Sequence, residues 1–191
     1  MTDLNDIRNR ISNIRDLVNT ISAFDEIRLQ KLANSVIELF RQGNKIAFVG
    51  NGGSAAEAMH LAAEFTGKCI SDHVPLPALC LNESQSSLTA ISNDYGANEV
   101  FARMVEAHLR RNDLLIALST SGSSENIVKA MHQALKQGVV VILWTGINSP
   151  NYPEIETWKA PSSTTPRIQE IHLMWGHILA EVVELSFRKS L

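Results

Sequence analysis

Residues 45–64 read KIAFVGNGGSAAEAMHLAAE, and they are the most informative segment of the chain because they join a buried strand, a glycine turn and a helix. Residues 46–49 are apolar without polar alternation, which is typical of a central strand in a parallel sheet covered on both faces. Gly50, Gly52 and Gly53 follow, and residues without a Cβ allow the backbone to turn sharply and lie close to a ligand. The stretch therefore predicts the first strand–turn–helix unit of an α/β domain, with Ser54 as the helix cap.

The same order recurs in residues 113–138, DLLIALSTSGSSENIVKAMHQALKQG, with a strand, a small polar turn and a helix from Ser124. Further strands are expected at residues 78–81 and 139–144, with a short edge strand near 155–158. One long C-terminal helix starts near Thr165 or Pro166. Strands that alternate with helices indicate a doubly wound parallel sheet, in which ligands bind at the carboxyl ends of the strands.

The first part of the chain predicts two helices. Residues 3–21 carry a narrow apolar seam at alternating spacings of three and four, made of Leu4, Ile7, Ile11, Ile14, Val18 and Ile21. This seam fits packing on the chain's own domain, but we favour pairing between subunits. Residues 25–41 form the second helix, with Ile27, Leu32, Val36, Ile37 and Phe40 facing inward. Residues 1–42 therefore predict a helical hairpin that packs on the core or on a neighbouring subunit.

Length and composition favour one globular domain over residues 1–191. The chain has 191 residues, of which 45% are hydrophobic, and a net charge of −3 that offers no basic footprint for nucleic acid or an acidic membrane surface. Cys69 and Cys80 are too far apart for a CxxC motif, so free thiols are expected. The sequence shows no apolar signal core and no run of about 18 apolar residues. We therefore expect a cytoplasmic protein without nucleic-acid or membrane partners.

Two helices carry side chains that could bind a metal. His60 and Glu64 are four residues apart and share one helix face, where they are either a solvated pair or two ligands. Gln169 and His177 lie on the C-terminal helix, eight residues and about 12 Å apart. One ion could join them only if both side chains lean inward or symmetry-related subunits share the ligands. The other histidines are read as structural (His172) or as surface residues (His73, His108 and His132).

The turn after the strand at residues 114–118 is a candidate phosphate site. Its hydroxyls, at Ser119, Thr120, Ser121 and Ser124, exceed what one helix cap uses, and Gly122 permits close approach. The alternative is a capped, serine-rich turn. Residues 93–96, NDYG, read as a polar turn that leads to a helix over residues 98–109.

Four ordered motifs resemble one family, the bacterial phosphoheptose isomerases of the SIS (sugar isomerase) fold. They are GNGGSAAEAMHLAAEFTGK, SNDYG, ALSTSGSSENIVKA and RIQEIHLMWGHIL, and the resemblance covers nearly the whole chain. The chain departs from the family at Ser123, where relatives often have Asn, and at Pro166. The resemblance implies a flavodoxin-like doubly wound sheet flanked by helices, and a homotetramer with active sites at subunit interfaces.

The resemblance also implies a set of site residues. One zinc per subunit would be bound by His60, Glu64, Gln169 and His177, with Glu64 and His177 as the catalytic pair. Ser119, Thr120, Ser121 and Ser124 would hold the phosphate. The sugar would contact Asn51, Gly52, Gly53, Asn93 and Asp94, together with Glu64 and Gln169.

The function implied is the isomerisation of sedoheptulose 7-phosphate to D-glycero-D-manno-heptose 7-phosphate, which feeds nucleotide-heptose and lipopolysaccharide synthesis. Such a reaction moves a proton between C1 and C2 and needs a base, an acid and a stabilised enediolate oxygen. Two alternatives are non-catalytic: a DiaA-like tetrameric regulator that binds the replication initiator protein, and a phosphosugar-sensing module. The presence of both Glu64 and His177 favours catalysis.

Overall fold

A computed structural model describes residues 3–21 and 23–188. Its strands are β1 (Ile46–Gly50), β2 (Ala78–Cys80), β3 (Leu114–Ser119), β4 (Val140–Gly146) and β5 (Glu156–Ala160). Its α-helices are α1 (Leu4–Asn19), α2 (Ala23–Arg41), α3 (Gly53–Thr66), α4 (Gln85–Tyr95), α5 (Val100–His108), α6 (Glu125–Lys136) and α7 (Thr165–Glu184). Two 3₁₀ turns, η1 (Ala97–Glu99) and η2 (Leu185–Phe187), complete the elements.

The strands form one parallel sheet in the order β2-β1-β3-β4-β5. The connections change direction between β1 and β3, which is the switch point of a flavodoxin-like doubly wound sheet. The glycine turn follows β1 and the serine-rich turn follows β3, so both meet at the carboxyl edge where ligands are expected. The predicted fold class is confirmed, with strand bounds shifted by one or two residues.

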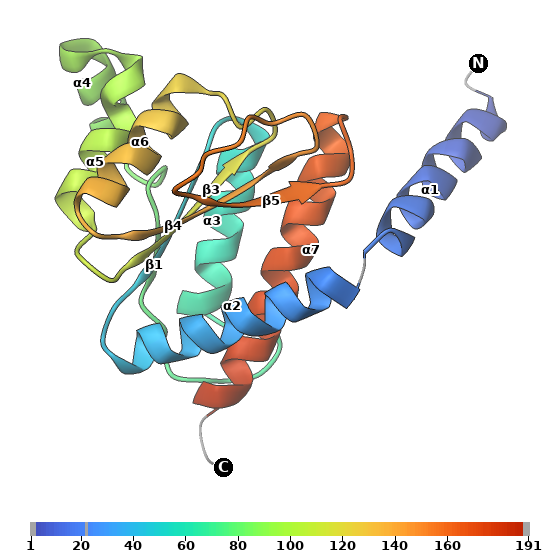
Figure 1. Ribbon diagram of the computed structural model, residues 1–191, viewed down its shortest axis with the longest axis horizontal. Coiled ribbons are helices and arrows are strands. Elements are labelled where there is room, and N and C mark those ends of the chain that lie inside the picture. The colour runs from blue at the N-terminus through green and yellow to red at the C-terminus, as the bar shows by residue number, and fades with distance from the viewer. Residues whose placement is uncertain (1–2, 22, 189–191) are drawn as a thin grey trace.

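Alternating side chains of the strands form two cores. From β1, Ile46 and Phe48 face the core shared with α2, α3 and α7, while Ala47 and Val49 face the core shared with α5 and α6. Figure 1 shows the two layers, with α3 and α7 side by side on one face of the sheet. All of β1 is buried, as its continuous apolar run predicted.

The first helix departs from the prediction. In Figure 1, α1 points away from the body instead of folding back along α2, so the described residues do not form the hairpin expected over residues 1–42. Leu17 is buried near its end, but Leu4, Ile7 and Ile11 are each about half exposed. The apolar seam of α1 therefore lies largely uncovered in one chain. On α2 the inward face is as predicted except at Ile27, which is 50% exposed.

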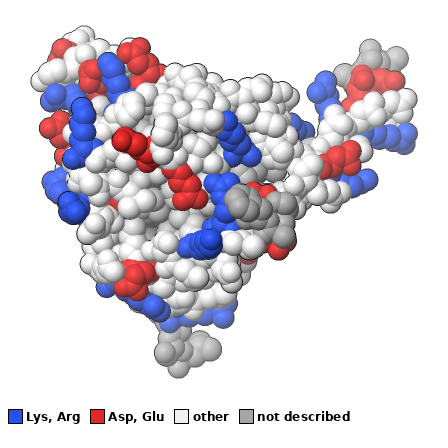
Figure 2. Space-filling model, in the orientation of Figure 1, with Lys and Arg blue, Asp and Glu red and all other residues white. Residues whose placement is uncertain are grey.

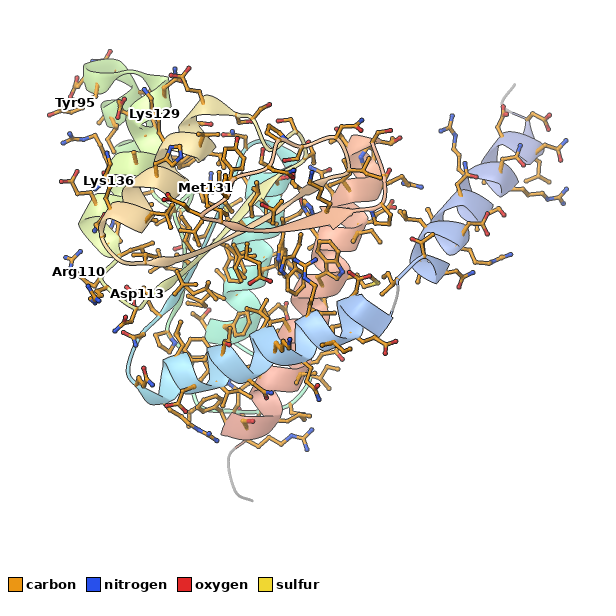
Figure 3. All side chains as sticks on the ribbon, in the orientation of Figure 1. Tyr95, Arg110, Asp113, Lys129, Met131 and Lys136 are labelled. Atoms are coloured by element: carbon orange, nitrogen blue, oxygen red, sulfur yellow. The ribbon has the colours of Figure 1, made fainter. Side chains whose placement is uncertain are left out.

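Residues 93–95 are helical, so the predicted polar turn is wrong. They end α4, whose N-cap Ser84 accepts a hydrogen bond from the Ser87 N–H. The α4–η1–α5 segment is held by Lys129, whose ammonium lies 2.7 Å from Glu99, and by Arg103, whose guanidinium lies 3.8 Å from the centroid of the Tyr95 ring. Figure 3 shows Tyr95 and Lys129 at the same end of the molecule, on α4 and α6.

The two cysteines are free thiols, as expected. Charges of both signs are interspersed over the face shown in Figure 2. In the part of the chain that the structure describes, no helix has both the length and the apolar character needed to cross a membrane.

Candidate active site

The glycine turn brings α3 and α7 into contact at the carboxyl edge of the sheet. Gly52 has φ +54° and ψ −120°, a conformation that residues with a Cβ rarely adopt. A Cβ on Gly53 would overlap the amide end of the Gln169 side chain, which would then have to shift. Ser54 does not cap the helix, contrary to the prediction. It lies within α3, and its buried hydroxyl oxygen is 3.4 Å from the Gln169 amide nitrogen, which donates to it.

Two turns further along the same pair of helices, three side chains converge. His60 and Glu64 from α3 meet His177 from α7, and their ligand atoms all lie within 4.8 Å of one another. The Nε2 atoms of His60 and His177 are 2.7 Å apart, and His60 Nε2 is 3.5 Å from a Glu64 oxygen. The structure brings these three predicted residues together, and we call them the triad.

The triad has the donor atoms that a zinc ion prefers. Two imidazole nitrogens and one carboxylate match catalytic zinc sites, which use three protein ligands and leave a further position open. The His60 side chain is 48% exposed, so the triad is accessible from the surface of the chain. The residues present therefore fit a zinc ion.

Gln169 lies away from the triad within one chain. Its amide contacts Ser54 and Gly53, and eight residues of α7, about 12 Å, separate it from His177. Of the two arrangements considered from the sequence, a single ion bound by inward-leaning side chains does not fit this placement. Gln169 stays a predicted ligand only if subunits share the site.

The serine-rich turn leaves its hydroxyls free of the helix it precedes. Ser124 occupies the N-cap position of α6, yet its side chain makes no capping hydrogen bond. Ser119 Oγ accepts the N–H of Gly122, whose φ is +66°, and Ser121 Oγ accepts the N–H of Ser123. The turn thus folds on itself, and the capped-turn interpretation does not explain Ser124.

A hollow of about 470 Å³ lies beside this turn. Thr120, Ser121 and Ser123 form one wall, and Ser162, Ser163 and Thr165 line it from the start of α7. The second group was missed in the sequence, although the run SSTT at residues 162–165 is as rich in hydroxyls as the first turn. Hydroxyls beside helix starts suit a phosphate group.

A second hollow, of about 590 Å³, brings together predicted sugar-contacting residues. Asn51, Gly52 and Asn93 line it, although Asn93 comes from α4. Asn126, which no sequence pattern singled out, exchanges two hydrogen bonds of 2.9 and 3.0 Å with the Asn51 amide. Asp94 does not line this hollow. It lines the groove between α4 and α5, and one of its oxygens accepts a hydrogen bond from Asn93.

Glu57 and His172 form a buried pair between α3 and α7. The Glu57 Oε1 atom lies 3.9 Å from His172 Nδ1, and neither residue is more than 5% exposed. Burial raises the pKa of Glu57 to about 7, which the Ser54 hydroxyl partly offsets. Burial lowers the pKa of His172 to about 4, against a smaller opposing effect of the Thr145 carbonyl. His172 is structural, as predicted, and lies outside the triad.

Comparison with known proteins agrees with this geometry. A family model described as "SIS domain" matches residues 11–146. The phosphoheptose isomerase of Rhodospirillum rubrum is 44% identical over 158 residues, which cover 82% of this chain and 84% of that protein. The chain belongs to the SIS family of phosphoheptose isomerases. The family member of Aneurinibacillus thermoaerophilus is 39% identical over 182 residues, covering 93% of this chain and 92% of its own.

Solved structures of the family share the whole fold. The phosphoheptose isomerase GmhA of Neisseria gonorrhoeae matches with a TM-score of 0.86 and 30% identity, covering 95% of this chain and 98% of that chain. The enzyme of Francisella tularensis matches with the same TM-score and 26% identity, covering 97% of this chain and all of the other. The resemblance inferred from the four motifs is confirmed.

Proposed function

We propose that the chain is an aldose–ketose isomerase that converts sedoheptulose 7-phosphate to D-glycero-D-manno-heptose 7-phosphate. The observation that carries this proposal is the triad, which joins a carboxylate and an imidazole from two helices in a member of the phosphoheptose isomerases. A non-catalytic regulator would not need these groups together. Within the described residues, no observation specifically favours the regulator or the sensing module.

Glu64 is the proposed base that moves a proton between C1 and C2, and His177 is the proposed acid that exchanges a proton with the sugar oxygens. Glu64 is only 16% exposed, so its carboxylate is held largely out of water. A zinc ion bound by the triad would act as a Lewis acid that polarises the carbonyl. Its native identity, and its stoichiometry of one per subunit, are part of the proposal.

The hydroxyls of Ser119, Thr120, Ser121 and Ser124 are proposed to hold the phosphate. Support comes from the Ser124 hydroxyl, which makes no capping hydrogen bond to α6, and from the hydroxyl-lined hollow beside the turn. Asn51, Gly52, Gly53, Asn93 and Asp94 are the proposed sugar contacts. The hollow shared by Asn51 and Asn93 supports two of these directly, whereas Asp94 would need to act from the neighbouring groove.

A homotetramer with sites at its interfaces is proposed on two grounds. The α1 seam is exposed in a single chain, as Leu4 at 56% and Ile11 at 54% illustrate. The distance between Gln169 and His177 also requires two subunits if both are to bind one ion. The cytoplasmic location remains a prediction.

The test is isomerase turnover of sedoheptulose 7-phosphate, with and without zinc, followed by NMR. Glu64→Gln and His177→Gln should each lose turnover by about 100-fold or more while remaining folded. His132→Gln, an exposed histidine on α6, is the matched control and should keep wild-type turnover. Full turnover in either triad variant would overturn the assigned roles. Binding to an initiator protein without turnover of any heptose phosphate would identify a regulator instead.

A further inference from the structure

The buried pair of Glu57 and His172 has a definite arrangement of protons. His172 Nε2 lies 3.4 Å from the Thr145 carbonyl oxygen, which can only accept a hydrogen bond. The proton of the neutral imidazole is therefore on Nε2. Nδ1 is then a bare acceptor, and it faces Glu57 Oε1 at 3.9 Å. An ionised carboxylate would place two acceptors opposite each other.

The surroundings favour neutral groups on both sides. His172 is fully buried, and its ring stacks on Trp175 at 5.9 Å between centroids and lies 6.2 Å from Trp144. Neither Glu57 oxygen has a hydrogen-bond partner within the described residues. In that same part of the chain, His172 is the only basic side chain within 4.0 Å of the Glu57 carboxylate. A buried carboxylate without a donor is costly, and protonation removes that cost.

We propose that Glu57 is a neutral carboxylic acid, that a small shift from the 3.9 Å separation lets its hydroxyl donate to His172 Nδ1, and that this pair positions α3 against α7. The pair lies at the level between the Gly53–Gln169 contact and the triad, on the buried side of the same helix–helix contact. It would thereby fix how His177 meets the two α3 members of the triad. The effect on turnover rests on the function proposed above, whereas the protonation of Glu57 does not.

A second buried glutamate provides a matched control. Glu184, at the end of α7, is 2% exposed, but its carboxylate accepts the backbone N–H groups of Cys69, Ile70 and Ser71. Those three donors stabilise the charged form. Two glutamates of similar burial are therefore expected in opposite protonation states, because Glu184 accepts from three backbone N–H groups whereas the Ser54 hydroxyl only partly offsets the burial of Glu57.

Infrared spectroscopy of the whole protein tests the protonation state. At a pH of about 6 the wild type should show the carbonyl stretch of a protonated carboxylic acid, since ordinary glutamates are ionised there. Glu57→Gln should lose this band and Glu184→Gln should keep it. Nitrogen shifts of labelled histidine should report His172 as the neutral Nε2–H form. An unchanged band in Glu57→Gln, or a protonated Nδ1 on His172, would overturn the proposal.

Rescue by a conservative variant tests the positioning role. The amide introduced by Glu57→Gln retains an N–H donor for His172, so this variant should keep zinc affinity and kcat within about twofold of wild type. Glu57→Leu has no donor and should lose about 10-fold or more in zinc affinity, measured by titration of the folded protein without substrate. Wild-type zinc affinity in folded Glu57→Leu, or equal losses in both variants, would contradict the role. Because zinc affinity does not depend on the substrate, an inactive wild type would count only against the proposed function.

Discussion

Replacing Glu57 by Gln should reveal a pH dependence of stability that the wild type conceals. In the folded chain the pKa of Glu57 is raised from 4.5 to about 7. The contribution of Glu57 to the free energy of unfolding is therefore complete below pH 4.5 and is lost as the pH rises through 7. At about 1.4 kcal/mol per pKa unit, this difference corresponds to about 3 kcal/mol.

His172 acts with the opposite sign. Its folded pKa is lowered from 6.5 to about 4, so its contribution is complete above pH 6.5 and is lost as the pH falls through 4. This contribution to the free energy of unfolding is again about 3 kcal/mol. Between pH 4.5 and 6.5 the Glu57 contribution to the free energy of unfolding falls as the pH rises, the His172 contribution grows, and the two changes cancel. The wild type should therefore show little pH dependence from this pair in that range.

Glu57→Gln removes the pH dependence that comes from Glu57 and keeps the pH dependence that comes from His172. The free energy of unfolding of the variant should rise by about 3 kcal/mol, relative to that of the wild type, between pH 4.5 and 6.5. Urea unfolding followed by the fluorescence of the buried Trp144, Trp158 and Trp175 measures it, at fixed protein concentration because assembly shifts apparent stability. Glu184→Gln is the control, whose profile should run parallel to wild type over this range. Parallel profiles for wild type and Glu57→Gln would mean that Glu57 does not bind an extra proton in the folded chain.

Three other changes test separate parts of the structure. Ser124→Ala should raise KM for the sugar phosphate about 10-fold without lowering stability, because the Ser124 hydroxyl does not cap α6. A loss of about 1 kcal/mol in the free energy of unfolding would instead show that this hydroxyl caps the helix. Gly53→Ala should displace the amide end of the Gln169 side chain and lower stability by less than about 1 kcal/mol, measured by thermal unfolding, because that end can move. A loss of about 3 kcal/mol would show that Gln169 is fixed in place. Ile11→Asp should reduce the assembled mass in sedimentation while each chain stays folded by circular dichroism, and an unaltered mass would remove the seam from the interface.

Elements whose apolar faces are buried could be predicted from the sequence. The β1 and β3 runs, the glycine at each turn and the α7 start at Thr165 are local signals, and the structure confirms them. Helix α4 was missed because none of its described residues is fully buried, so it lacks the apolar stripe that marks a helix. The seam on α1 predicted a helix correctly, but not the direction in which it leaves the domain.

Burial of single polar residues could not be predicted, because it depends on distant partners. His73 was expected at the surface, yet it is 2% exposed and lies 4.0 Å from Glu184, which comes 111 positions later in the chain. The placement of Glu57 is similar. It lies one turn before His60 on α3, yet its carboxylate faces His172 of α7 and not the triad. Sequence spacing gives the face of a helix but not which neighbour covers it.

The candidate site shows how far spacing alone can lead. Helices α3 and α7 run in the same direction, because Gly53 meets Gln169 at one end and Leu61 meets Gly176 further along. Both helices rise by the same distance per residue. Two turns beyond the Gln169 contact they therefore reach the level of His177, where His60 and Glu64 also lie. Two parallel helices in contact therefore present Gln169 and His177 at different levels, one beside the glycine turn and one in the triad. A site that uses both on one ion must draw them from different chains, so Gln169 can join the triad as a zinc ligand only in an assembled protein.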